Sequence, residues 1–139
     1  MKNRKNNKGF SLVELIVVVA IMAVLVGVLA PAYLKYVENS RQQKDISAVG
    51  EVVNAIKIAA ADEDVAQEIT ATGITVSVPK KGAVSTTATN LNAELVAILD
   101  DVELTAKDAD AVTITVKTST ANDLIITVAG PAYIANAFS

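Results

Sequence analysis

The chain has 139 residues, enough for one modest core, and it is 52% hydrophobic but only 4% aromatic. It contains no His, Cys or Trp, so imidazole bases, thiolate nucleophiles and Cys/His metal sites lack their atoms, which argues against an enzyme. The net charge is −3, yet a third of the basic residues lie before residue 10 and the rest of the chain is acidic. We therefore predict no specific nucleic-acid partner and no cofactor.

The first predicted element is an apolar helix. No charged residue occurs from Leu15 to Leu34, and a helix of this length would be about 30 Å long, which matches the hydrocarbon thickness of a bilayer. Because a basic cluster precedes the run, we expect the N-terminus in the cytoplasm and everything after Lys35 outside.

Three interpretations of this segment compete: a cleaved signal peptide, a plain anchor, and a specialised leader whose helix is retained. Ala30-Pro31-Ala32 has the small-x-small pattern of a signal cleavage site, and cleavage after Ala32 would release an ordinary secreted binding domain. However, the apolar run is longer than a typical signal sequence, and Pro31 lies inside the site. Glu14 favours the specialised leader, because a carboxylate entering a membrane is costly without a positive partner.

The stretch Lys8-Gly9-Phe10-Ser11-Leu12-Val13-Glu14-Leu15, between a basic leader and an apolar run, resembles the class III leader of type IV pilins and type II secretion pseudopilins. The resemblance covers roughly the first 35 residues. It implies that a membrane peptidase cleaves between Gly9 and Phe10 and methylates the new amine of Phe10. It implies a structural subunit of an extracellular type IV pilus, whose partners are other copies, the prepilin peptidase and methylase, the assembly machinery and, before assembly, the cytoplasmic membrane.

Cleavage at this position would leave a positive amine on Phe10, one helical turn from Glu14. We expect Glu14 of one copy to meet the Phe10 amine of a neighbour, so that this ion pair sets the register between subunits. Pro31 removes one helical hydrogen bond and would crowd the turn at Gly27, so a soft point is expected between these two residues.

Beyond Leu34 the helical pattern changes from apolar all round to amphipathic, with apolar residues at three- and four-residue spacing. A single helix is predicted from about residue 11 to about residue 61, ended by the acidic residues 62–64. The chain therefore divides into a leader at 1–9, a membrane or filament-core helix at 10–34, an amphipathic half at 35–61 and a head at 62–139.

The head is predicted from alternating apolar and polar residues. Such segments occur at 74–78, 112–116 and 124–128, and the last two are expected to form an antiparallel hairpin. Residues 80–82 are expected to turn, 83–89 to form a surface loop, and 91–100 to form a short helix. Asn90 is its predicted cap, and the predicted inward residues are Leu91, Leu95, Val96, Ile98 and Leu99.

The predicted fold class is α+β: a long N-terminal helix packed against a small antiparallel sheet with one short extra helix. A head of this size is too small for a secure core of its own, so the sheet is expected to pack on the amphipathic half of the long helix. Many pilin heads carry a disulfide near the C-terminus, but this chain has no Cys, so we expect packing alone to hold its C-terminal region.

One acidic cluster is a candidate calcium site, because carboxylates at loop spacing suit this ion. No Asp-x-Asp-x-Asp-Gly loop is present, and acidic loops are usually solvated, so no metal is predicted. Calcium-dependent folding would favour the alternative function, a type II secretion pseudopilin. The candidate ligands are Asp100, Asp101, Glu103, Asp108 and Asp110.

Overall fold

The computed structural model describes residues 9–121 and 123–139, and the chain divides into two compact units, one ending at Val37 and the other running from Glu38 to Ser139. The longest element is α1 (Leu12–Ala59), so the long helix predicted from the sequence is confirmed to within two residues at each end. The chain stays helical through Gly27 and Pro31. The soft point expected between these two residues stays a prediction.

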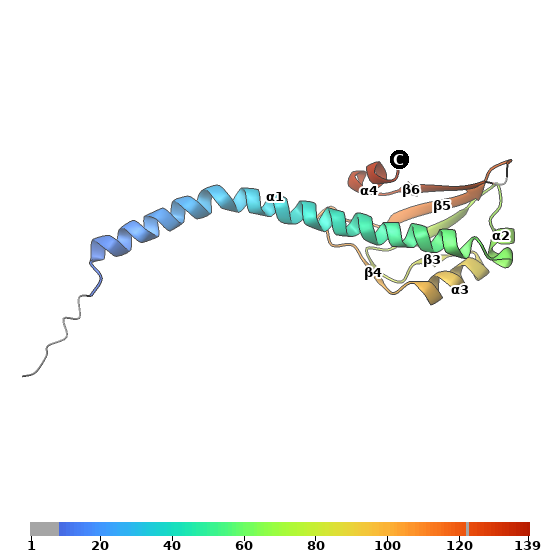
Figure 1. The fold of residues 1–139 in the computed structure, drawn as a ribbon, viewed down its shortest axis with the longest axis horizontal. Helices are drawn as coiled ribbons and strands as arrows, with labels where there is room; N and C mark the ends of the chain where they lie inside the picture. Colours follow the sequence, from blue (N-terminus) through green and yellow to red (C-terminus); the bar gives the residue numbers. More distant parts are fainter. Residues whose placement is uncertain (1–8, 122) are drawn as a thin grey trace, which may run out of the picture. The chain divides into compact units, whose positions relative to one another are not determined.

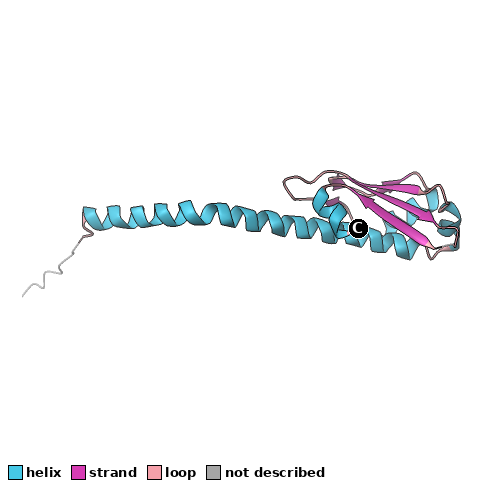
Figure 2. Ribbon diagram, turned by 90° about the horizontal axis from the view of Figure 1, so that it is seen from above, coloured by secondary structure: helices cyan, strands magenta, loops and turns pink. Residues whose placement is uncertain are grey.

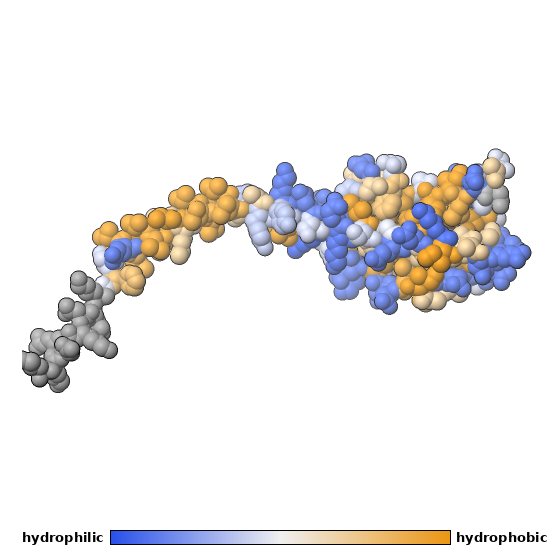
Figure 3. Space-filling model, viewed as in Figure 1, coloured by the Kyte–Doolittle hydropathy of each residue, from blue (hydrophilic) through white to orange (hydrophobic). Residues whose placement is uncertain are grey.

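The first unit exposes its apolar side chains. Every residue from Gly9 to Tyr36 is exposed, including the whole charge-free run, which appears as a continuous hydrophobic surface in Figure 3. By length and composition, α1 is also the helix of the described chain that is suited to cross a membrane. These side chains therefore have no apolar partner within the described part of the unit.

The second unit contains a four-stranded antiparallel sheet with the strand order β3-β1-β5-β6, and a two-stranded sheet of β2 and β4 (Figures 1 and 2). The strands are β1 (Ile74–Val78), β2 (Lys81–Gly82), β3 (Ser85–Thr86), β4 (Val102–Glu103), β5 (Val112–Thr118) and β6 (Leu124–Ala129). The short helices are α2 (Glu63–Glu68), α3 (Thr89–Ile98) and α4 (Ala132–Ala137).

The core lies between the sheet and the part of α1 that belongs to the second unit. Alternate residues of the two central strands are buried, with Val76 of β1 opposite Ile114 of β5. They pack in one hydrophobic cluster with Val49, Val52 and Ile56 of α1, all of which are fully buried. The α+β fold class and the hairpin of β5 and β6 are thus confirmed.

The prediction for the helix at 91–100 was wrong in its bounds, its cap and part of its inward face. The helix begins at Thr89 and ends at Ile98, with Ala88 at the cap position. Leu91 and Leu95 are buried, but Val96 and Ile98 are 59% and 44% exposed. Val96 follows Leu95 by about 100° around the helix and so leaves the buried face, whereas Ile98 is the last helical residue.

Several short elements also differ from the prediction. The expected loop at 83–89 contains β3, the expected turn at 80–82 contains β2, and the residues after α1 form α2. The expected hairpin is followed by α4, which starts directly after Pro131. Two-residue strands and six-residue helices are too short to show a periodic pattern, so sequence periodicity did not reveal them.

Glu68 of α2 provides the cap that α3 lacks. Its carboxylate accepts hydrogen bonds from the backbone N–H groups of Asn90, at 3.0 Å, and Leu91, at 3.1 Å. These donors favour the ionised form, so the bond from Asn90 first, and then that from Leu91, lowers the pKa of Glu68 below its ordinary value. The carboxylate of one helix thus caps the first turn of the next.

We expect the attachment of α2 to α3 to weaken in acid. Because the pKa of Glu68 is lowered in the fold, its contribution is fully present above the ordinary value of 4.5 and is lost as the pH falls through the lowered pKa. The protection factors of the Asn90 and Leu91 amides against hydrogen exchange should therefore fall selectively in acid. In Glu68→Gln this pH dependence should disappear, whereas Glu63→Gln, on the same helix, should keep it. Equal pH dependence in all three proteins would contradict the assignment.

Candidate functional site

The chain changes from non-helical to helical at Ser11, the second residue after the predicted cleavage position. The Ser11 carbonyl oxygen accepts the first helical hydrogen bond, from the Leu15 N–H at 3.2 Å. The Ser11 Oγ accepts from the Val13 N–H at 3.3 Å, and the Glu14 carboxylate accepts from the Ser11 N–H at 2.8 Å. This reciprocal arrangement is a capping box, and it satisfies two backbone N–H groups at the helix start.

The capping role of Ser11 and Glu14 was not predicted from the sequence. The signal was present, because Ser11 and Glu14 have the S-x-x-E spacing that precedes many apolar helices. Glu14 was instead assigned only a role toward the membrane and neighbouring subunits. The structure adds that this carboxylate already has a partner within its own chain, the N–H of Ser11.

The peptide bond between Gly9 and Phe10 lies outside the helix, and both residues are exposed, Phe10 by 94%. A Cβ atom added at Gly9 would meet no described atom within 4 Å, and the same holds at Gly27. The described part of the chain therefore does not itself require glycine at position 9. Any requirement for glycine there must come from a partner that binds this segment.

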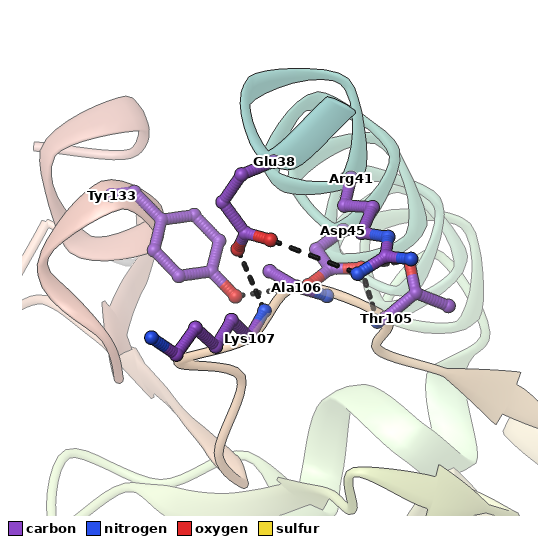
Figure 4. A network of polar contacts seen from close by, with 7 residues as sticks. All are labelled: Glu38, Arg41, Asp45, Thr105, Ala106, Lys107 and Tyr133. Atoms are coloured by element: carbon purple, nitrogen blue, oxygen red, sulfur yellow. Dashed lines mark hydrogen bonds and ion pairs between the residues drawn. The ribbon is translucent and has the colours of Figure 1, made fainter. Parts of the chain in front are cut away.

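A second polar site joins three segments of the second unit around Asp45 of α1 (Figure 4). Asp45 is fully buried, and its carboxylate accepts hydrogen bonds from the N–H groups of Thr105, at 2.7 Å, and Ala106, at 3.0 Å. It also accepts bonds from the Thr105 hydroxyl at 3.3 Å and the Tyr133 hydroxyl at 2.9 Å. Burial raises the pKa of Tyr133, and the hydrogen bond to Asp45 raises it further.

Glu38 extends this network along α1. Its carboxylate accepts a hydrogen bond from the Lys107 N–H at 2.6 Å and lies 3.9 Å from the Arg41 guanidinium.

The expectation that packing alone holds the C-terminal region was wrong. The bond from Tyr133 of α4 to Asp45 of α1 fixes this region as well. Neither Asp45 nor Tyr133 was singled out from the sequence, because they are far apart along the chain.

Comparison with known proteins addresses the N-terminal segment. The family model described as "Prokaryotic N-terminal methylation motif" matches residues 4–30. A type IV major fimbrial protein FimA of Dichelobacter nodosus is 36% identical over 61 residues, which is 44% of this chain and 38% of the relative. The N-terminal segment thus matches this methylation motif, and part of the chain resembles type IV fimbrial proteins. A second FimA of the same organism is 36% identical over 55 residues, 40% of this chain and 35% of that relative.

The similarity to type IV pilins is partial. The chain matches less than two fifths of the length of these FimA relatives, and no solved structure matches it. The matched motif includes Gly9, Phe10, Glu14 and Gly27, whereas Pro31 lies one residue beyond it. The relatives are named as fimbrial proteins, not as enzymes.

The acidic residues considered for the pseudopilin alternative are not gathered into a metal site. Among residues 9–121 and 123–139, no group of three or more acidic side chains is placed to hold a metal ion. Glu103 of β4 lies 3.5 Å from the Lys81 ammonium of β2, and Asp110 accepts a hydrogen bond from the N–H of Ala111. Each of these two carboxylates thus has a partner close to it in the structure.

Proposed function

We propose that this chain is a structural subunit of an extracellular type IV pilus, and that it acts by polymerising. One observation carries the proposal: a pilin-type N-terminal segment leads directly into a helix whose apolar side chains are uncovered as far as Tyr36. A surface of this kind needs lipid before assembly and neighbouring helices after it. The partners are therefore the cytoplasmic membrane, then other copies of the chain, delivered by a pilus assembly machinery.

Processing would convert the membrane-bound precursor into the subunit. A prepilin peptidase would cleave between Gly9 and Phe10, remove the basic leader at 1–9 and methylate the Phe10 amine. The exposed, non-helical position of this bond supports the proposal, because proteases bind their substrates in non-helical form. Residues 10–34 would then form the filament core, with residues 35–61 and the head at 62–139 outside the membrane.

Glu14 would set the axial register between neighbouring subunits. In the described chain its carboxylate accepts a hydrogen bond from the N–H of Ser11. Cleavage would place a positive amine on Phe10, the residue directly before Ser11. Two opposite charges 4 Å apart attract by about 4 kcal/mol at an effective dielectric constant near 20, before desolvation offsets part of this. Pairing of Glu14 with the amine of a neighbouring copy would favour one axial offset, and softening between Gly27 and Pro31 would let the helices adapt.

The N-terminus of protein sheared from the cell surface tests this function. We expect mass spectrometry and sequencing to find a chain that begins with N-methylated Phe10. Gly9→Val should block cleavage and retain the leader, whereas Gly27→Ala, at a glycine with equally open surroundings, should be processed normally. A sheared chain beginning at Tyr33 would instead identify an ordinary secreted domain and overturn the proposal.

A further inference from the structure

The apolar face of the sheet extends beyond the part that α1 covers. On β5, Ile114 and Val116 are fully buried. Their partners on β6, Val128 and Ile126, are only partly buried, although they lie on the same face. Leu124, at the start of this row, is 36% exposed. Since β6 is an edge strand, the core-facing row along it is incompletely covered.

This row lines a groove between α1 and β6. We call this hollow, of about 440 Å³, the α1–β6 groove. It is bordered by Val53, Lys57, Leu124, Ile126, Val128 and Phe138. A neighbouring hollow shares Lys57 and Leu124 with it, so the groove continues toward α2. Lys57 is exposed, and in the described part of the chain it makes no ion pair. The side chains that line the groove are thus apolar except for Lys57, which forms no ion pair in the described residues.

A complementary feature lies at the other edge of the sheet. Helix α3 contacts β3, which is the edge strand opposite β6. Its exposed side chain Val96 borders one hollow together with Asp100 and Asp101, and these three residues are here called the α3 tip. Within the described ranges, neither carboxylate has an ion pair or a hydrogen bond from another group. The tip thus combines an apolar side chain with two carboxylates that form no ion pair, although Lys44 of α1 borders a second hollow beside them.

We propose that the α1–β6 groove of one copy receives the α3 tip of the next copy, with Lys57 facing Asp100 and Asp101. This inference rests on the proposed function. Apolar surface meets apolar surface and opposite charges meet, so the two uncovered features of one chain satisfy each other. The groove and the tip lie at opposite edges of the sheet, so the contact is heterologous. Each added copy therefore leaves an unoccupied groove or tip for the next copy. A heterologous contact generates a ring if the rotation between copies closes and an open helix if it does not, and the proposed filament requires the open form.

Cysteine crosslinking in whole filaments tests the contact, because the natural chain has no Cys. In the double variant Val96→Cys/Leu124→Cys, oxidation of surface filaments should produce a ladder of covalent oligomers on a non-reducing gel. Either single variant should give no ladder, because tip meets groove and not itself. The matched control is Val96→Cys/Ile125→Cys, since Ile125 is 38% exposed but points to the other face of β6.

The outcomes separate this inference from the proposed function. Filaments that begin at Phe10 but give no ladder would overturn the contact and leave the pilin function standing. Dimers in a single variant, an equal ladder in the Ile125 control, or crosslinks to a different protein would also overturn it. Absence of filaments or leader cleavage in the natural chain would instead count against the function itself.

Charge reversal provides a second test that does not depend on crosslinking. Lys57→Glu, and separately Asp100→Lys/Asp101→Lys, should each weaken the contact by up to about fivefold and lower the yield of sheared filaments. The combined triple variant should recover yield, because the opposite charges again face each other. A triple variant with the summed loss of both parents would overturn the proposed pairing.

Discussion

Replacing Glu14 by Ala is expected to abolish filament assembly while leaving the protein in the membrane. The apolar run that carries insertion is unchanged, but the negative partner of the neighbour's amine is gone. If desolvation offsets half of the attraction of about 4 kcal/mol, the remainder corresponds to about 30-fold per contact, repeated at every subunit. The measurement is the amount of the protein in sheared filaments relative to the membrane fraction.

Two further variants separate the charge of Glu14 from its capping role. Glu14→Gln retains an oxygen that accepts the Ser11 N–H but lacks the charge, so it should fail to assemble as Glu14→Ala does. Ser11→Ala removes the acceptor for the Val13 N–H but keeps the carboxylate, so it should assemble close to normally. Normal filament yield from Glu14→Gln would show that the charge is dispensable and would exclude the register role.

The elements that could be predicted from the sequence are those with a local, repeated signal. The apolar run and the amphipathic pattern after it located α1, and alternation located β1, β5 and β6. The pilin-type segment was recognised because its key residues lie within one short stretch. In each of these cases the information that determines the structure is held within a few turns or one strand of chain.

The features that could not be predicted depend on residues far apart in the chain. The cap of α3 comes from Glu68 and not from the adjacent Asn90. Likewise, the sequence pattern indicates that Asp45 is one of several charges on the polar side of an amphipathic helix. Only the folded chain brings Thr105 and Tyr133 to it. Hydropathy patterns carry no information on such pairings, because most of the donors are backbone N–H groups, which every residue except proline has.

Asp45→Ala is expected to destabilise the second unit by about 3 kcal/mol, since it leaves the buried Ala106 N–H and the partly buried donors of Thr105 and Tyr133 without their acceptor. Tyr133→Phe removes a donor and should cost only about 1 kcal/mol. Hydrogen exchange of the β5 amides in the full chain, kept in detergent, measures both changes, because these amides lie in the core of the sheet. Asp101→Ala, which removes an exposed carboxylate, is the control and should leave the exchange unchanged.

The combined variant Asp45→Ala/Tyr133→Phe tests whether the two residues act together. The loss should be less than the sum of the single losses, because the second substitution removes the hydroxyl that the first leaves without an acceptor. Additive losses, or a loss from Asp45→Ala no larger than that from Tyr133→Phe, would contradict the network. The network around Asp45 contains no cysteine, so reducing agents should not loosen the C-terminal region. The attachment of this region depends instead on the Asp45 carboxylate and the groups that donate hydrogen bonds to it.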